Sequence, residues 1–199
     1  LTLQHLWLVA LAVGLAIIIG VPLGILIVRH KWLATPVLGI ATIVLTIPSI
    51  ALFGLMIPLF SLIGQGIGAL PAITAVFLYS LLPIVRNTYA GLCSVPASLL
   101  EAANGIGMTK WQRLRQVEIP NAWPVMLSGI RIATAINVGT APLAFLIGAS
   151  SYGELIFPGI YLNDFPTLIL GAAATALFAL ILDTLLAALG RLLSPHLAR

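Results

Sequence analysis

A stretch of mixed charge separates two long apolar runs of this sequence and holds the side chains best suited to functional work. It contains Glu101-Ala102-Ala103, then Gly107, and then Val117-Glu118-Ile119-Pro120. A carboxylate, small residues and a glycine on a short helical segment can form a compact surface that fits a groove on another protein. We therefore expect this stretch to take force from a partner.

Residues for catalysis or metal binding do not form a recognisable set. The segment Gly148-Ala149-Ser150-Ser151-Tyr152 lacks the G-x-S-x-G spacing of a nucleophile elbow. His5, His30 and His196 lie near predicted ends, where we expect them to be solvated. A single cysteine, Cys93, excludes a multi-cysteine metal site. We predict that the chain is not an enzyme and holds no metal.

Composition indicates an integral membrane protein. Of the 199 residues, 61% are hydrophobic and 7% are charged, and the mean hydropathy is +1.17. Ordinary soluble domains are about 25% charged. The net charge of +4 comes from clustered cations, which membrane topology explains better than nucleic-acid binding.

Five apolar runs are each near or above the roughly 20 residues needed to cross a membrane as a helix. They cover about residues 3–28, 36–60, 71–92, 123–148 and 166–189. The sequence therefore predicts an all-α bundle with five transmembrane helices in a single domain, residues 1–199. We expect the first helix to serve as its own insertion signal, with no separate signal peptide.

The positions of the cations predict the orientation, because Lys and Arg near span ends stay in the cytoplasm. With the N-terminus outside and the C-terminus inside, the cations at the span ends fall on the cytoplasmic side. These are Arg29, Lys31, Lys110, Arg113, Arg115, Arg191 and Arg199. The two outer loops, about residues 64–70 and 150–165, contain no Lys or Arg. We expect Glu154 and Asp164 to face outward.

The polar segment of about residues 94–120 predicts two short helices on the cytoplasmic side. Ser94 is expected to cap the first helix, and Gly105 and Gly107 are expected to stop it. One face of that helix would carry Leu99, Leu100, Ala103 and Ile106.

The second of these helices is expected to begin at a capping box formed by Thr109 and the glutamine three residues later. We expect Pro120 to end it. Glu101 could pair with a basic residue of a partner, or with Arg113 or Arg115 of this chain.

The spacing of this segment resembles the EAA loop of ABC-importer permeases. The pattern is Glu-Ala-Ala, three residues, Gly, nine residues, a branched apolar residue, one residue and Ile-Pro, where the family more often has Leu-Pro. The matching residues are Glu101, Ala102, Ala103, Gly107, Val117, Ile119 and Pro120. The resemblance implies that Glu101, Ala102, Ala103, Gly107, Ile119 and Pro120 couple the chain to an ATPase.

Three further stretches are similar to the permeases that import the osmoprotectants glycine betaine, carnitine or choline. They are residues 46–52, 81–89 and 129–137. The resemblance implies a type I ABC importer permease fold in a bacterial or archaeal cytoplasmic membrane. It also implies a second permease subunit, identical or related, a cytoplasmic ATPase dimer and an extracytoplasmic substrate-binding protein. The sequence has no Walker motif, so ATP and Mg are expected in the ATPase, with no cofactor in this chain.

Three charged residues lie inside predicted spans, where each costs roughly 2.5–3.5 kcal/mol at mid-membrane on insertion scales. Arg86, Arg131 and Asp183 lie at comparable depth, about two turns from the cytoplasmic ends of their spans. Asp183 could form a charge clasp with Arg131 or Arg86. In the alternative, the arginines extend separately to the interface.

A path for a small zwitterion or cation is expected to be lined by uncharged polar side chains. The candidates are Thr46, Ser49, Thr134, Asn137 and Thr140. Helix-to-helix hydrogen bonding is the competing explanation for each. Among the prolines of the spans, Pro48 is the best candidate for a break that lines the path, and helix packing alone is the alternative. The aromatic residues of the outer loop, beginning with Tyr152, are expected to be interfacial anchors.

The alternative function is that of an ion-coupled secondary transporter of a small polar solute. Such carriers usually show repeated halves and intramembrane carboxylates. Five spans and the single deep carboxylate of Asp183 argue against this class. Dependence of transport on ATP and on a binding protein separates the two functions.

Overall fold

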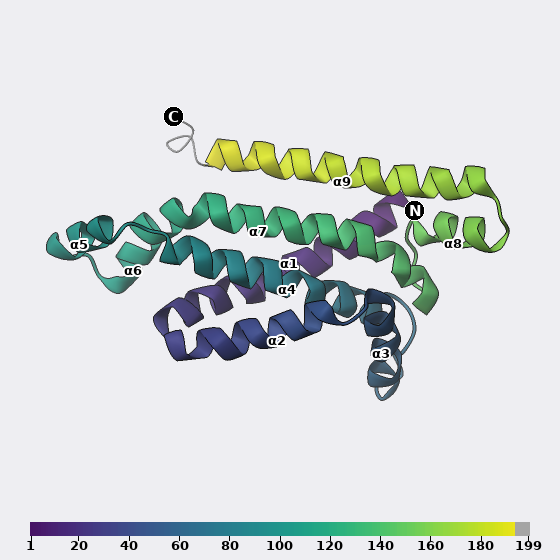
Figure 1. The fold of residues 1–199 in the computed structure, drawn as a ribbon, viewed down its shortest axis with the longest axis horizontal. Coiled ribbons are helices and arrows are strands. Elements are labelled where there is room, and N and C mark those ends of the chain that lie inside the picture. Colours follow the sequence, from purple (N-terminus) through teal and green to yellow (C-terminus); the bar gives the residue numbers. More distant parts are fainter. Residues whose placement is uncertain (194–199) are drawn as a thin grey trace.

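The computed structural model describes residues 1–193, and every regular element in this range is helical (Figure 1). The long helices are α1 (Thr2–Arg29), α4 (Ala69–Cys93), α7 (Ile119–Thr140) and α9 (Phe165–Leu193). The short elements are η1 (Lys31–Leu33), α2 (Ala34–Thr46), α3 (Ser49–Ser61), α5 (Ala97–Gly105), α6 (Lys110–Arg113), η2 (Leu114–Glu118), η3 (Ala141–Ile147) and α8 (Gly153–Tyr161). The predictions that Arg199 is cytoplasmic and His196 is solvated concern residues outside the described range.

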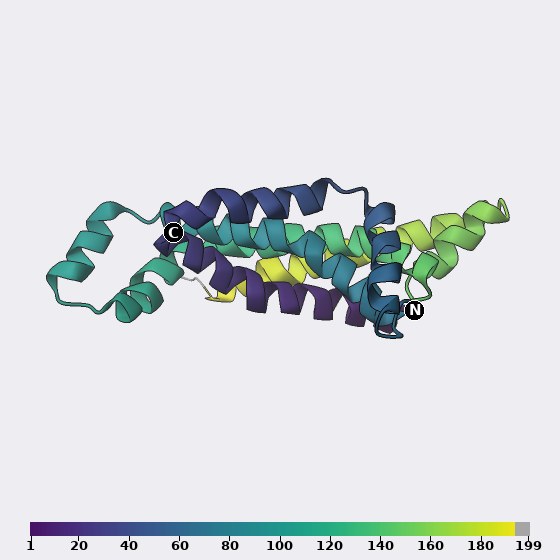
Figure 2. The same ribbon diagram turned by 90° about the horizontal axis from the view of Figure 1, so that it is seen from below.

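Within residues 1–193, four helices are long and apolar enough to cross a membrane, and a bent pair, residues 31–46 with 49–61, makes a fifth if it counts as one span. The predicted continuous span over 36–60 is therefore wrong in detail. α3 turns by 102° from the direction of the preceding helix, and it lies across the end of the bundle (Figures 1 and 2).

Proline chemistry explains this break. Pro48 has no N–H to continue the helix, and its ring disfavours helical geometry at the residue before it. Ile47 is accordingly extended, with ψ of 128°. The Tyr79 hydroxyl on α4 donates to the Ile47 carbonyl oxygen, which the break frees. The break expected at Pro48 is confirmed, and its place along a path stays a prediction.

Helices α1, α4 and α7 form the centre of the bundle, and small residues let them approach closely. A Cβ at Gly24 of α1 would lie 2.6 Å from Thr88 of α4. A Cβ at Gly129 of α7 would lie 2.6 Å from the Pro83 carbonyl oxygen of α4. Without such glycines, α4 could not be enclosed between the other two helices. The main apolar core surrounds it.

α9 lies on the outside of the bundle along α7 and packs against α8 (Figure 1). Only 11% of its most apolar window is buried inside this chain, which leaves the rest for lipid or another subunit. α8 lies within the predicted outer loop of 150–165 and was not predicted as a helix. With 9 residues, it is too short to cross a membrane.

Two residues at the outer end differ from expectation. His5 is fully buried, not solvated, because its ring packs on Tyr152 and Phe178, with ring centroids 4.6 and 5.5 Å away. Its Nδ1 accepts a hydrogen bond from the Tyr152 backbone N–H at 3.4 Å. Tyr152 is therefore buried in the packing of α1 and α9 and is not an interfacial anchor.

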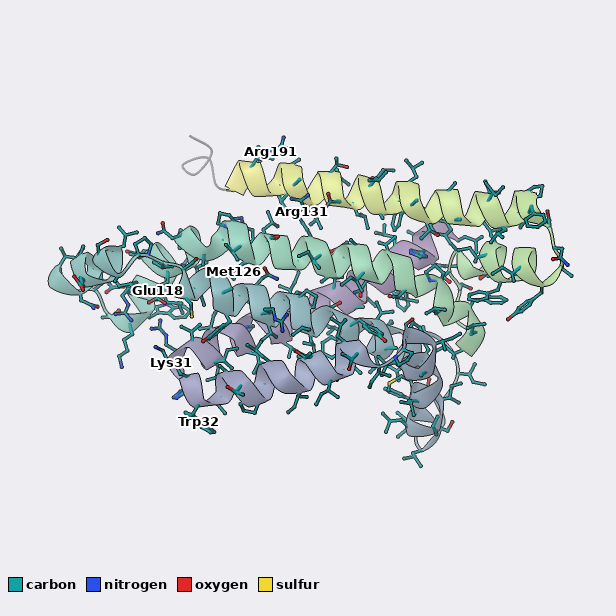
Figure 3. All side chains as sticks on the ribbon, in the orientation of Figure 1. Lys31, Trp32, Glu118, Met126, Arg131 and Arg191 are labelled. Atoms are coloured by element: carbon teal, nitrogen blue, oxygen red, sulfur yellow. The ribbon has the colours of Figure 1, made fainter. Side chains whose placement is uncertain are left out.

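The two ends of the bundle differ in charge. Figure 3 shows Lys31, Glu118 and Arg191 toward the end from which α5 and α6 project. Glu154 lies in the first turn of α8 at the opposite end, and Asp164 precedes α9 there. The separation that the sequence predicted along the chain is thus kept in space.

Candidate functional site: the charged hairpin and the intramembrane ion pair

The hairpin, residues 96–118, projects beyond the end of α1, α4 and α7 (Figures 1 and 2). Its first helix, α5, ends at Gly105, and Gly107 follows in the left-handed conformation with φ of +78°. A left-handed residue just after a helix lets the following backbone N–H groups bond to the last carbonyl oxygens of that helix. Here the Met108 N–H donates to the Ala103 carbonyl oxygen at 3.0 Å. The stop expected at these glycines is confirmed.

The expected cap of α5 is wrong. Pro96 occupies the N-cap position, and no side chain caps the helix. The Ser94 hydroxyl instead donates to the Gly91 carbonyl oxygen at 2.8 Å, so it completes the last turn of α4. A serine close to two helix ends can serve either one, and the sequence alone does not separate these cases.

The second half of the hairpin begins as predicted and ends differently. The Thr109 N–H donates to Gln112 Oε1 at 2.8 Å, and the Gln112 N–H donates to Thr109 Oγ1 at 3.3 Å. Pro120 does not end this helix. It lies in the first turn of α7, where its missing N–H is tolerated.

The chain reaches Pro120 through a π-helix, η2, which covers Leu114–Glu118. Proline cannot donate to the turn before it and crowds that turn. A wider π turn accommodates this loss and allows the helix to continue, and such turns are frequent at functional sites.

The predicted coupling residues fall into two groups. Glu101, Ala102 and Gly107 are exposed on the hairpin, together with the apolar side chains of Ile106 (76% exposed) and Trp111 (67% exposed). Ala103 is buried beneath this surface. Ile119 and Pro120 lie at the base, where Ile119 packs with Leu92, Val95, Leu114, Ala122 and Met126.

Glu101 makes no ion pair with any other residue in 1–193, so the pairing considered with Arg113 or Arg115 does not occur in this structure. Arg113 is turned instead toward Glu118, at 2.8 Å from Nε to Oε1, and toward Asn104, at 2.8 Å from Nη1 to Oδ1. The carboxylate of Glu101 is left on the surface.

Glu118 is the site residue whose partners the sequence did not reveal. It is 4% exposed, and Arg29 of α1 donates from Nη2 to its two oxygens at 3.1 and 3.0 Å. The pairing spans 89 residues of sequence. The sequence held one indication of this pairing. The predicted topology placed Arg29, Arg113 and Glu118 at the same face of the membrane.

Inside the predicted membrane region, Arg131 of α7 and Asp183 of α9 form a two-pronged ion pair. Arg131 Nε donates to Oδ1 at 2.8 Å and Nη2 donates to Oδ2 at 2.7 Å. Asp183 thus pairs with Arg131 and not with Arg86, the other arginine considered for the clasp. Arg86 points toward α2, with Nη2 3.5 Å from Thr42 Oγ1.

The candidate path residues do not form one open polar surface in this conformation. Thr134 and Asn137 are buried, and Asn137 Nδ2 donates to Ser80 Oγ on α4. The Thr140 hydroxyl donates to the Ile136 carbonyl oxygen of its own helix at 3.0 Å. The hydroxyls of Thr134 and Thr46 likewise donate to carbonyl oxygens of their own helices. Ser49 begins α3 at the break. Helix-to-helix bonding thus describes Asn137, and the path itself stays a prediction.

A bundle of this shape, with a helical hairpin at one end, is the fold of ABC importer permeases. A chain of the structure "Inward facing conformations of the MetNI methionine ABC transporter" matches with a TM-score of 0.80 over 98% of this chain and 94% of that chain, at 24% identity. A chain of "Crystal structure of an amino acid ABC transporter with histidines" matches with a TM-score of 0.71 over 95% of this chain and 90% of that one, at 22% identity. The expected type I importer fold is confirmed.

Residues 12–199 match the family "Binding-protein-dependent transport system inner membrane component", and the chain belongs to that family. It is 71% identical over 195 residues to the osmoprotectant import permease protein OsmY of Salmonella typhimurium, covering 97% of this chain and 80% of the relative. It is 44% identical to the glycine betaine/carnitine/choline transport system permease protein OpuCB of Bacillus subtilis, covering 96% and 86%.

The family membership decides the class of protein. The chain is a multi-pass inner-membrane permease and not an enzyme, and ATP hydrolysis belongs to a separate subunit. An ATPase and a substrate-binding protein are its general partners. The alternative of an ion-coupled secondary transporter is thereby set aside.

Proposed function

We propose that this chain is the permease subunit of an ATP-driven importer for osmoprotectants with a quaternary amine, such as glycine betaine, carnitine or choline. The names of similar permeases support this substrate class, since they include osmoprotectant import, choline transport and carnitine transport proteins. The chain covers 80–91% of the first four of these relatives, so the similarity extends through most of each protein.

The observation that carries the proposed mechanism is the exposed tip of the hairpin. Ile106 and Trp111 present large apolar side chains beyond the bundle, and Glu101 adds an unpaired carboxylate among the described residues. An apolar knob with one charge is suited to a groove on a soluble protein. In this proposal the tip docks into the ATPase dimer, which binds ATP with Mg.

The orientation follows from the charges at the two ends. The hairpin end carries Arg29, Lys31 and Arg191, and the opposite connections carry Glu154 and Asp164. Positive residues near span ends stay in the cytoplasm. The hairpin therefore faces the cytoplasm and the N-terminus faces outward, where the binding protein delivers its solute.

Closure of the ATPase would move the docked hairpin and favour one state of the permease over the other. Taking a two-state equilibrium from 1:99 to 99:1 needs roughly 5.5 kcal/mol of difference in interaction. A second permease subunit, identical or related, would complete the path, because Thr134 and Asn137 of this chain are buried in its own packing and form no open polar surface with the other candidates.

Cysteine cross-linking tests the docking. In a Cys93→Ser background, Ile106→Cys is expected to cross-link to the ATPase subunit in the assembled transporter. Ile67→Cys is the matched control, since Ile67 is similarly exposed (72%) but lies in the connection at the opposite end. A cross-link from Ile67 but not from Ile106 would overturn both the docking and the orientation.

Uptake in proteoliposomes tests the substrate class. Radiolabelled glycine betaine, carnitine and choline are offered to the permease reconstituted with its ATPase and its binding protein. We expect uptake of at least one that requires both ATP and the binding protein. Uptake driven by an ion gradient without ATP would contradict the proposal.

A further inference from the structure

The base of the hairpin is tied to the first helix of the bundle through one buried carboxylate. Glu118, the last residue of η2, accepts hydrogen bonds from Arg29 at the end of α1 and from Arg113 of α6. Arg113 in turn donates to Asn104 of α5. The chain of contacts Arg29–Glu118–Arg113–Asn104 therefore runs from a membrane-spanning helix to both halves of the hairpin.

These bonds differ in kind from the apolar contacts around them. The cluster at the hairpin base, which includes Leu92 and Leu114, also touches Ile25 and Val28 of α1, but apolar contact is non-directional and allows neighbours to slide. Charge-assisted hydrogen bonds fix distance and angle. Among the described residues, the bonds to Arg29 are thus the directional connection from α1 to the hairpin.

The connection is placed at a point where the helix can change its geometry. Glu118 closes a π turn, and α7 begins at the next residue. A π turn holds its hydrogen bonds in a wider register than the α-helices on either side. A displacement of the hairpin could be absorbed at this turn, unless a contact fixes the angle between hairpin and bundle.

We propose that Glu118 is a positioning residue for coupling, which makes α1 follow the hairpin when the ATPase moves it. The proposal rests on the docking proposed above. One carboxylate lies between two guanidinium groups, and its side chain is 6% exposed. Neutralising it leaves Arg29 and Arg113 as facing cations, so attraction becomes repulsion while the shape of the side chain is kept.

A distance measurement in the assembled transporter tests this directly and needs no solute. Spin labels at Lys31→Cys, next to the end of α1, and at Ser98→Cys, exposed on α5 of the hairpin, are introduced in a Cys93→Ser background. We expect a narrow distance distribution that is unchanged when ATP and vanadate close the ATPase. With Glu118→Gln added, we expect the distribution to broaden or shift on closure.

Glycine betaine uptake and phosphate release, measured together without labels, give the functional result. We expect Glu118→Gln to lower uptake per ATP hydrolysed by at least tenfold, while the ATPase still co-purifies and hydrolyses ATP. Arg29→Gln is expected to show the same defect, and Arg29→Lys to restore part of it. The double variant Arg29→Gln/Glu118→Gln is expected to be no worse than the poorer single variant, because both remove one contact.

The control is Glu154→Gln, which neutralises a carboxylate at the opposite end and is expected to leave all these quantities unchanged. Two results would overturn the proposal. One is a wild-type distance distribution and wild-type uptake per ATP in Glu118→Gln. The other is a parallel loss of uptake, hydrolysis and co-purification, which would make Glu118 a residue for assembly alone. A failure of Ile106→Cys to cross-link to the ATPase would instead count against the docking.

Discussion

Arg131 on α7 and Asp183 on α9 share two parallel hydrogen bonds, 2.8 and 2.7 Å long, within the part of the bundle expected to lie in the membrane. Two-pronged arginine–carboxylate pairs fix orientation as well as distance. α9 has few buried contacts with the rest of the chain. The pair therefore adds a directional contact between α9 and α7 to the packing around it.

Breaking this pair is predicted to loosen α9. Arg131→Gln or Asp183→Asn leaves one uncompensated charge in the membrane, and each is expected to destabilise the protein by about 1–2 kcal/mol, with both side chains partly exposed. The double variant is expected to recover part of that loss. Thermal unfolding in detergent measures all three variants.

Arg86→Gln is the matched control for this prediction, because Arg86 is an arginine at similar predicted depth that donates to Thr42 Oγ1 and forms no ion pair within residues 1–193. It is expected to lower the unfolding temperature less than Arg131→Gln does. Strict additivity of Arg131→Gln and Asp183→Asn would show that the pair carries no coupling.

Close packing of α1 on α4 gives a second prediction. A Cβ at Gly24 would lie 2.6 Å from Thr88 and 3.2 Å from the Val85 carbonyl oxygen, so Gly24→Ala must move one helix away from the other. We expect a loss of about 1–3 kcal/mol in stability. Thermal unfolding and the yield of monodisperse protein are the measurements.

Gly14→Ala serves as its control, because Gly14 lies on the same helix and a Cβ there meets nothing within 4 Å. Alanine also favours the helix more than glycine does. Gly14→Ala is therefore expected to be neutral or slightly stabilising. Equal losses in the two variants would mean that the helix approach is not the cause.

The sequence predicted those features that depend on one residue type or on local spacing. Runs of apolar residues located four of the five spans as continuous helices, and the side of the membrane that the cations predict for the hairpin stays a prediction. Pro48 marked a helix break, but its consequence, a turn of 102° into α3, depends on packing against α4. The capping box at Thr109 needed no tertiary information and formed as expected.

Features that depend on distant partners could not be predicted in the same way. The pairing of Glu118 with Arg29 joins residues 89 positions apart, and no local pattern specifies it. His5 was expected in solvent because it lies near an end, yet rings from α9 and from the turn before α8 cover it. From their predicted depth in the membrane, either Arg86 or Arg131 could pair with Asp183. The arrangement of the helices brings Arg131 to it.

The turn of the hairpin gives a third prediction. Gly107 has a φ of +78°, and a Cβ there meets no atom within 4 Å, so the cost of a side chain is conformational. L-residues in this region cost roughly 1–2 kcal/mol. Gly107→Ala is expected to weaken the ATPase association about five- to thirtyfold, and Gly107→Trp to abolish transport while insertion stays intact. Co-purification of the ATPase and uptake in vesicles are the measurements.

Gly105→Ala is the control for the turn, because Gly105 also has open space around its Cβ position but ends α5 without a positive φ. It is expected to leave the association unchanged. Normal transport by Gly107→Trp would refute the docking role of the hairpin. A bulky residue at Glu101 is expected to abolish transport in the same way, because its side chain lies on the docking surface.

Tyr79 gives the last prediction, which concerns the break between α2 and α3. Its hydroxyl donates to the Ile47 carbonyl oxygen, and an unpaired carbonyl in the membrane is costly. Tyr79→Phe keeps the ring and removes the donor, so we expect a loss of about 1 kcal/mol in stability, the size typical of hydrogen bonds between membrane helices. We also expect a wider spread of distances between spin labels on α2 and α3.

Tyr161→Phe is the control, since Tyr161 is 68% exposed, and its effect is expected to be negligible. If Tyr79→Phe leaves both the unfolding temperature and the label distances unchanged, Pro48 alone fixes the break and the hydroxyl is not needed.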